Sequence, residues 1–60
     1  MLESEKKRYQ EKLDKMTDVG LLDELFIVYN LARNGWRNEY YYLDCEKLVR
    51  KEIINRMRSK

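Results

Sequence analysis

Residues 4–16, SEKKRYQEKLDKM, carry a narrow apolar stripe on an otherwise charged segment. Tyr9, Leu13 and Met16 follow the i, i+4, i+7 spacing that places side chains on one face of an α-helix, and Ser4 can cap its start. So few apolar groups give a short helix little stability of its own. We therefore predict an amphipathic helix over residues 4–16 that frays unless it docks on the rest of the chain.

Residues 18–33 form a far more apolar segment. The preceding Thr17 has a hydroxyl that can accept from the free amides of a first helical turn, and Asn34-Gly35 provides a typical helix stop. The apolar residues extend over more than half of the helical circumference. The stripe expected to face the core is Leu22, Leu25, Phe26, Tyr29 and Ala32, flanked by Leu21, Val28 and Leu31.

A third helical pattern covers residues 38–57, with Asn38 as its expected cap. Its expected inward stripe is Tyr42, Cys45, Leu48, Val49, Ile53 and Met57, with Tyr41 at one edge. The connection to the second helix is only about three to five residues long, which makes the two helices antiparallel neighbours. We predict one all-α domain over residues 1–60, an antiparallel helical hairpin with an additional short N-terminal helix.

The size of the chain suggests that this hairpin is completed by another molecule. Sixty residues bury little surface, and domains this small usually need disulfides, a metal, association or unusually good packing. Cys45 is the only cysteine and histidine is absent, so an internal disulfide and a Cys/His zinc site are excluded. Self-association or a partner remains. The lone cysteine and the lack of an apolar run of about 20 residues lead us to expect a cytoplasmic protein without a membrane span.

The sequence offers little catalytic chemistry. Cys45 has no imidazole to activate it and lies on the expected inward stripe, where it serves as a small apolar residue. The two glycines stand apart, so no phosphate-binding loop is present. The acidic residues between 14 and 24 lack the spacing of a calcium loop: Asp14, Asp18, Asp23 and Glu24. We expect a protein that is not an enzyme and binds no metal or cofactor.

Aromatic residues are concentrated where the second and third helices meet. Tyr40, Tyr41 and Tyr42 lie about 100° apart on a helix, so they cannot all face one core. Aromatic and arginine side chains are enriched at binding hot spots. The expected partner-binding residues are Trp36, Arg37, Tyr40, Tyr41 and Arg33; the alternative is that the aromatics close the end of the hairpin core. Further apolar residues lie outside the main stripes: Ile27, Leu31, Leu43 and Ile54.

Charge provides a second hypothesis. The formal charge is +1 for residues 1–17, −2 for 18–33 and +3 for 34–60. Four cations on the third helix, which could follow a phosphate backbone, are Lys47, Arg50, Lys51 and Arg58. A solvated helix face explains the same residues. A dimeric nucleic-acid-binding hairpin is therefore the first alternative, and a homo-oligomeric structural protein is the second.

The segment from TDVGLLDELFIVYNLARN through NEYYYLDCEKLVRKEIINRM resembles the small helical-hairpin inhibitors of Gram-positive bacteria and their phages, of the Sda type. The resemblance lies in the capped start before Leu21-Leu22-Asp23-Glu24, the aromatics of the first hairpin helix, and the ending with Glu52-Ile53 and Arg56. The connection here is longer than in that family. The resemblance implies a noncatalytic regulatory protein that binds and blocks a larger host protein, without naming the target.

Overall fold

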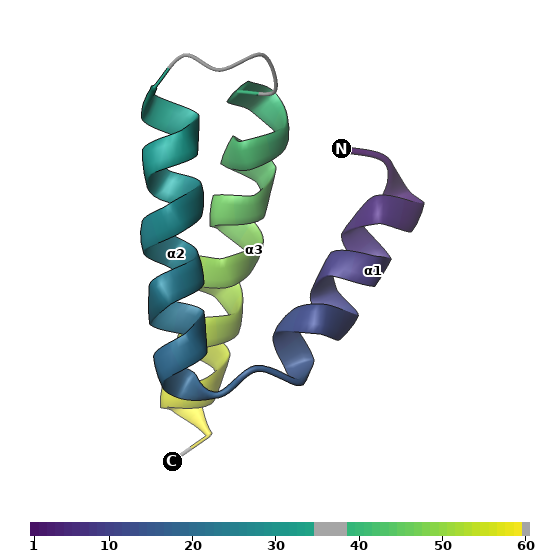
Figure 1. The fold of residues 1–60 in the computed structure, drawn as a ribbon. Coiled ribbons are helices and arrows are strands. Elements are labelled where there is room, and N and C mark those ends of the chain that lie inside the picture. Colours follow the sequence, from purple (N-terminus) through teal and green to yellow (C-terminus); the bar gives the residue numbers. More distant parts are fainter. Residues whose placement is uncertain (35–38, 60) are drawn as a thin grey trace.

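The computed structural model describes residues 1–34 and 39–59, which form three helices and no strand in these ranges. The helices are α1 (Glu3–Asp14), α2 (Asp18–Arg33) and α3 (Glu39–Arg58). Helices α2 and α3 lie side by side and antiparallel, while α1 is inclined beside α3 (Figure 1). The prediction of an all-α hairpin with an additional N-terminal helix is confirmed, with boundaries shifted by at most two residues.

The start of α2 follows the predicted capping. Thr17 is the N-cap residue, and its Oγ1 accepts from the Gly20 amide at 3.0 Å. The predicted cap of α1 is wrong, because that helix begins at Glu3 and Ser4 lies inside its first turn. Leu2 takes the N-cap position, and its amide donates to Glu5 Oε1 at 3.0 Å. This bond is the half of a capping box that the N3 carboxylate contributes, in which it accepts from the amide of the N-cap residue.

All three helices contribute to the core. The buried apolar side chains are Leu13, Leu21, Val28, Ala32, Cys45 and Val49. Leu13 has no exposed surface, and Tyr9 and Met16 pack partly buried against the same cluster. The stripe predicted for the first helix is therefore correct, and α1 docks on the hairpin.

Polar contacts also fix α1 against the other two helices. The Tyr9 hydroxyl donates to Glu24 Oε2 of α2 at 2.8 Å, and Gln10 Nε2 donates to Glu52 Oε1 of α3 at 2.8 Å. Burial and the Glu24 carboxylate raise the pKa of Tyr9. These interhelical contacts hold α1 on one side of the hairpin.

The stripe predicted for α2 is wrong in most of its members. Leu25 and Ala32 face the core as expected, but Leu21 and Val28 are buried there. The exposed fractions of Leu22, Phe26 and Tyr29 are 58%, 70% and 41%. The inward set, Leu21, Leu25 and Val28, has the same i, i+4, i+7 spacing as the exposed set. The two sets are offset by one position along the sequence, which corresponds to a rotation of about 100° around the helix. The smaller Val28 and Ala32 allow α3 to approach closely, whereas Phe26 and Tyr29 remain outside.

The stripe predicted for α3 is mostly correct. Cys45 and Val49 are buried, and Leu48 and Ile53 pack against the core cluster. Met57 is an exception at 69% exposure, because it lies in the last turn of α3. The other predicted members are partly buried: Tyr41 and Tyr42.

Candidate protein-binding surface

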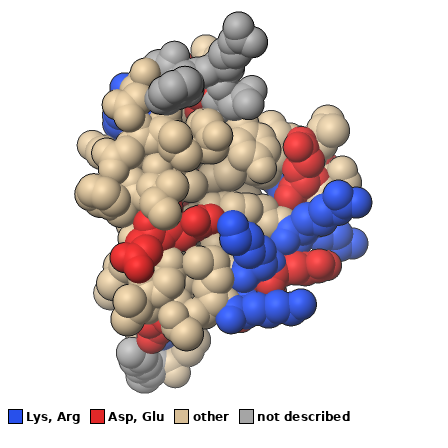
Figure 2. All heavy atoms as spheres, viewed as in Figure 1, with Lys and Arg blue, Asp and Glu red and all other residues tan. Residues whose placement is uncertain are grey.

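Positive charge is spread over more than one helix. The four cations considered for nucleic-acid binding are all exposed: Lys47, Arg50, Lys51 and Arg58. In the view of Figure 2, however, the Lys and Arg side chains gather over α1. Basic side chains are therefore not confined to α3, where the nucleic-acid alternative places them.

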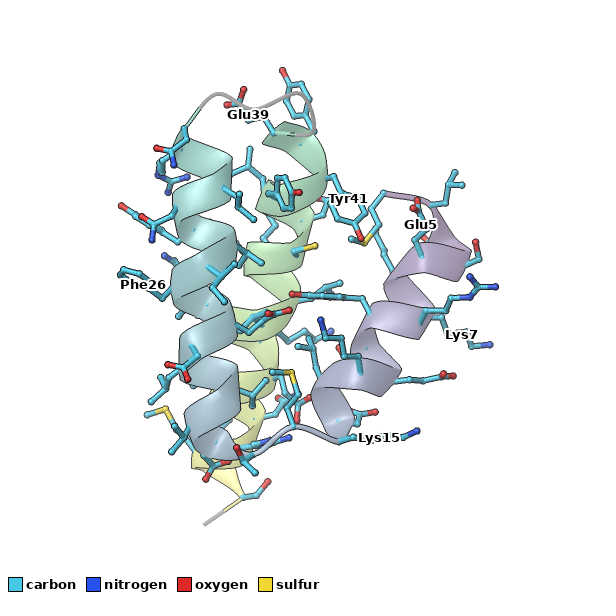
Figure 3. All side chains as sticks on the ribbon, viewed as in Figure 1. Glu5, Lys7, Lys15, Phe26, Glu39 and Tyr41 are labelled. Carbon is cyan, nitrogen blue, oxygen red and sulfur yellow. The ribbon has the colours of Figure 1, made fainter. Side chains whose placement is uncertain are left out.

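A stripe of large apolar side chains follows the outside of α2. It consists of Leu22, Phe26 and Tyr29, preceded one turn earlier by Val19, which is 69% exposed. The spacing of these residues is 3, 4 and 3, so their side chains form one continuous row along the helix. Figure 3 shows Phe26 pointing away from α1. The docking of α1 therefore leaves this row uncovered.

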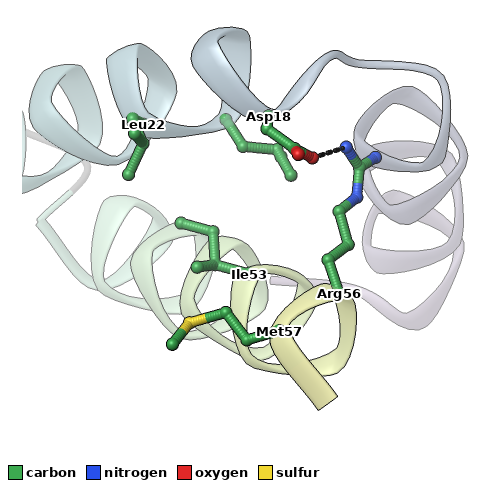
Figure 4. Close-up of a pocket in the computed structure, with 6 residues that line it drawn as sticks. Asp18, Leu22, Ile53, Arg56 and Met57 are labelled. Atoms are coloured by element: carbon green, nitrogen blue, oxygen red, sulfur yellow. Dashed lines mark hydrogen bonds and ion pairs between the residues drawn. The ribbon is translucent and has the colours of Figure 1, made fainter. Parts of the chain in front are cut away.

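Helix α3 widens the stripe into a shallow groove. A pocket of about 230 Å³ lies between the first turns of α2 and the last turns of α3 (Figure 4). It is lined by Asp18, Leu21, Leu22, Ile53, Arg56 and Met57. A second hollow of about 270 Å³ continues from it along α2, lined by Leu22, Leu25, Phe26, Tyr29 and Arg50. We call the surface formed by the exposed Val19, Leu22, Phe26, Tyr29 and Met57, together with the partly buried Ile53, the apolar face.

Two arginines and a buried carboxylate define one end of the apolar face. Glu46 is only 6% exposed, and its Oε1 lies 3.7 Å from a terminal nitrogen of Arg33 and 3.7 Å from one of Arg50. This oxygen has no hydrogen-bond partner among the described residues. The Arg33 guanidinium also lies over the Tyr29 ring, 4.4 Å from its centre. Both arginines remain about half exposed, so they can also meet a carboxylate of a partner.

At the other end of the apolar face, the first turn of α2 contributes an acidic side chain, Asp18. Asp18 Oδ1 accepts from Arg56 Nη1 at 2.9 Å, as Figure 4 shows, and the Asp18 side chain is still 63% exposed. Arg56 is held in turn by Glu52, whose Oε2 accepts from its Nε at 3.0 Å. The carboxylate of Asp18 is thus fixed in position while much of its surface faces solvent.

The predicted partner-binding residues separate into three groups. Trp36 and Arg37 lie outside the described residues. Tyr40 is 82% exposed at the start of α3, and Arg33 lies beside the apolar face. Tyr41 is partly buried, with its ring edge-to-face on Tyr42 at 5.5 Å between ring centres. The structure therefore leaves Arg33 and Tyr40 available, and places Tyr41 against the core.

The sequence interpretation missed the residues that dominate this surface. Leu22, Phe26 and Tyr29 form one of two overlapping apolar patterns at helical spacing. The other consists of Leu21, Leu25 and Val28, and periodicity alone does not choose between them. A usable signal was present in the residue sizes, since large aromatics on one pattern and smaller residues on the other favour the second for close helix packing.

The described residues give little support to a nucleophilic cysteine, a metal site or a membrane-spanning helix. Burial raises the pKa of the Cys45 thiol, which makes it a poor nucleophile. No group of three or more metal-binding side chains occurs in residues 1–34 and 39–59. Within the same ranges, no helix has both the length and the apolar character that crossing a membrane requires.

None of the protein-family models, curated proteins or solved structures compared with the chain matches it. The resemblance to Sda-type inhibitors therefore stays a prediction.

Proposed function

We propose that this chain is a small noncatalytic regulatory protein that binds a larger host protein through the apolar face. The single observation that carries the proposal is the row of Leu22, Phe26 and Tyr29, three large apolar side chains exposed at regular helical spacing. Contiguous exposed apolar surface of this kind marks interaction sites. A groove between two helices, with charged groups at its ends, suits an amphipathic helix of the partner.

The size of the face is consistent with reversible binding. If a partner covers about 400 Å² of apolar surface, the gross gain is about 10 kcal/mol at about 25 cal/mol per Å². Association costs about 4–15 kcal/mol in lost freedom of motion. These terms are of similar size, so the charged ends and the fit of Phe26 decide the affinity. A regulator that has to release its target benefits from this balance.

The resemblance to Sda-type inhibitors supports the same mode of action, in which a bacterial or phage hairpin binds and blocks a host protein. In that mode the protein changes no covalent bond. It occupies a surface that the target needs for its own activity. Arg33 contributes charge at one end of the apolar face, and Tyr40 offers additional aromatic surface near the hairpin connection.

The proposal is tested by capture from a bacterial lysate with matched variants of the immobilised protein. Phe26→Ala removes the most exposed aromatic side chain of the apolar face. Ile27→Ala is the matched control, because Ile27 is also exposed, at 51%, but lies about 100° further around α2. We expect a captured protein that is lost with Phe26→Ala and retained with Ile27→Ala. Equal capture by both variants would contradict the proposal. Tyr40→Ala shows separately whether the end of the hairpin contributes.

A further inference from the structure

We infer that, in the absence of its target, the protein covers the apolar face with a second copy of itself, packed antiparallel along α2. The inference rests on the proposed function only in taking this face as a binding surface. In the free protein a second copy covers the apolar face, and a target has to displace that copy in order to bind.

When two copies of α2 lie antiparallel, the charged and apolar residues of one copy face complementary residues of the other. We place the two-fold axis at the level along α2 that is midway between positions 25 and 26. This axis brings Asp18 of one copy opposite Arg33 of the other. The same axis places Leu22 opposite Tyr29. Each end of the contact then pairs an acidic group with a basic group, and the middle pairs apolar groups. A parallel arrangement would instead place Arg33 beside the second Arg33, which is unfavourable.

The side chains at both ends are in a position to make this pairing. The Asp18 side chain is 63% exposed and is held by Arg56. The Arg33 guanidinium is supported by the Tyr29 ring and by Glu46, and 48% of that side chain is exposed. Both side chains therefore combine contacts within the chain with exposed surface that a second copy can reach. Charged pairs of this kind fix the register and orientation of an interface more than they raise its affinity.

The spacing and the area of the face fit a weak dimer. Val19, Leu22, Phe26 and Tyr29 alternate by 3 and 4 residues, the pattern with which two helices pack along one seam. Helix α2 has 16 residues, so it is about 24 Å long, and two packed helices are about 20 Å wide. Two such faces bury at most about 1,000 Å², the lower end of specific interfaces. We therefore expect a dissociation constant in the micromolar range, which a tighter target can overcome.

Cysteine cross-linking tests the register. Leu22→Cys and Tyr29→Cys are prepared separately in a Cys45→Ala background, with circular dichroism to verify folding, and are oxidised alone and as a mixture. The inferred register predicts disulfide dimers mainly in the mixture. In each variant alone, the two cysteines are separated by about 10 Å along the helix axis. Ile27→Cys is the matched control and should give few dimers. Efficient cross-linking of each variant with itself, without a gain on mixing, would overturn the antiparallel register.

Sedimentation equilibrium of the unmodified chain provides the second measurement. We expect a monomer–dimer equilibrium, with a dissociation constant that Phe26→Ala raises about tenfold or more and Ile27→Ala leaves nearly unchanged. A monomer at all concentrations up to about 500 μM overturns self-association but leaves the face open to a different protein. A dimer that is equally stable with Phe26→Ala overturns the apolar face as the contact, and the proposed function loses its main support.

Discussion

Arg56 Nη2 donates to the carbonyl oxygen of Leu13 at 3.0 Å, across 43 positions of the sequence. The bond joins the last turn of α1 to the last turns of α3, while the Leu13 side chain is fully buried in the core. Helix α1 is thus anchored by a side chain and by its terminal carbonyl groups. Because α1 occupies this side of the hairpin, the apolar face on the other side stays open.

The burial of Leu13 predicts a large effect of truncation. Leu13→Ala leaves a cavity among all three helices, and we expect the free energy of unfolding to fall by about 2–5 kcal/mol. Urea denaturation followed by circular dichroism measures the change. Lys15→Ala, at an exposed position just after α1, is the control and should change it little. A loss below about 1 kcal/mol for Leu13→Ala would show that α1 is not part of the folded core.

Arg56 is expected to matter more than its neighbour Arg58. Its guanidinium contacts Glu52, Asp18 and the Leu13 carbonyl, whereas Arg58 is exposed in the final turn. Thermal unfolding of Arg56→Ala should show a lower midpoint than that of Arg58→Ala. Arg56→Lys should recover only part of the loss, because an ammonium group cannot reproduce the planar set of donors. Equal midpoints for the two alanine variants would refute this role.

The cap of α2 predicts a smaller effect. Thr17→Ala removes the acceptor for the Gly20 amide and should cost about 1 kcal/mol of stability. Thr17→Ser keeps a hydroxyl in the same position and should remain close to the unaltered protein. Chemical denaturation of the three proteins gives the comparison. If the alanine and serine variants are equally stable, the bond contributes nothing to the fold.

Tyr9 predicts a specific dependence on alkaline pH. Its pKa is raised in the folded protein by burial and by Glu24, while the unfolded chain releases the same proton near pH 10. The stability that Tyr9 provides is therefore complete below about pH 10 and falls above it, by up to about 1.4 kcal/mol per pH unit. The Tyr9→Phe variant has no phenolic hydroxyl at this position, so its stability lacks this contribution to the pH dependence. The stability gap between the two proteins, measured by denaturation from about pH 8 to about pH 11, should narrow as pH rises; a constant gap would contradict the shift.

The architecture was predictable because it depends on local signals. Helical periodicity located all three helices, Thr17 marked the start of α2, and the short connection made α2 and α3 antiparallel. The inward side of α3 was identified largely correctly through Cys45 and Val49. In α3 one apolar pattern clearly exceeds the others, so its rotation is well determined.

The orientation of α2 was not predictable in the same way. Two apolar patterns compete on this helix, one with Phe26 and Tyr29 and one with Leu21 and Val28, and periodicity alone does not choose between them. The choice depends on how closely α3 approaches, which is a tertiary property. The burial of Glu46 and the contact from Arg56 to Leu13 depend likewise on helix positions that periodicity does not specify. Trp36 and Arg37 remain untested, since they lie outside the described residues.

The most direct test of the apolar face is site-specific photo-cross-linking at two adjacent positions of α2. The photoreactive residue p-benzoylphenylalanine replaces Phe26 in one protein and Ile27 in the other, and both are irradiated in purified form and in a bacterial lysate. We predict that position 26 yields a dimer adduct when purified and a larger adduct in the lysate, while position 27 yields neither above background. Equal adducts at both positions, or none at position 26, would contradict the assignment of this face as the binding surface.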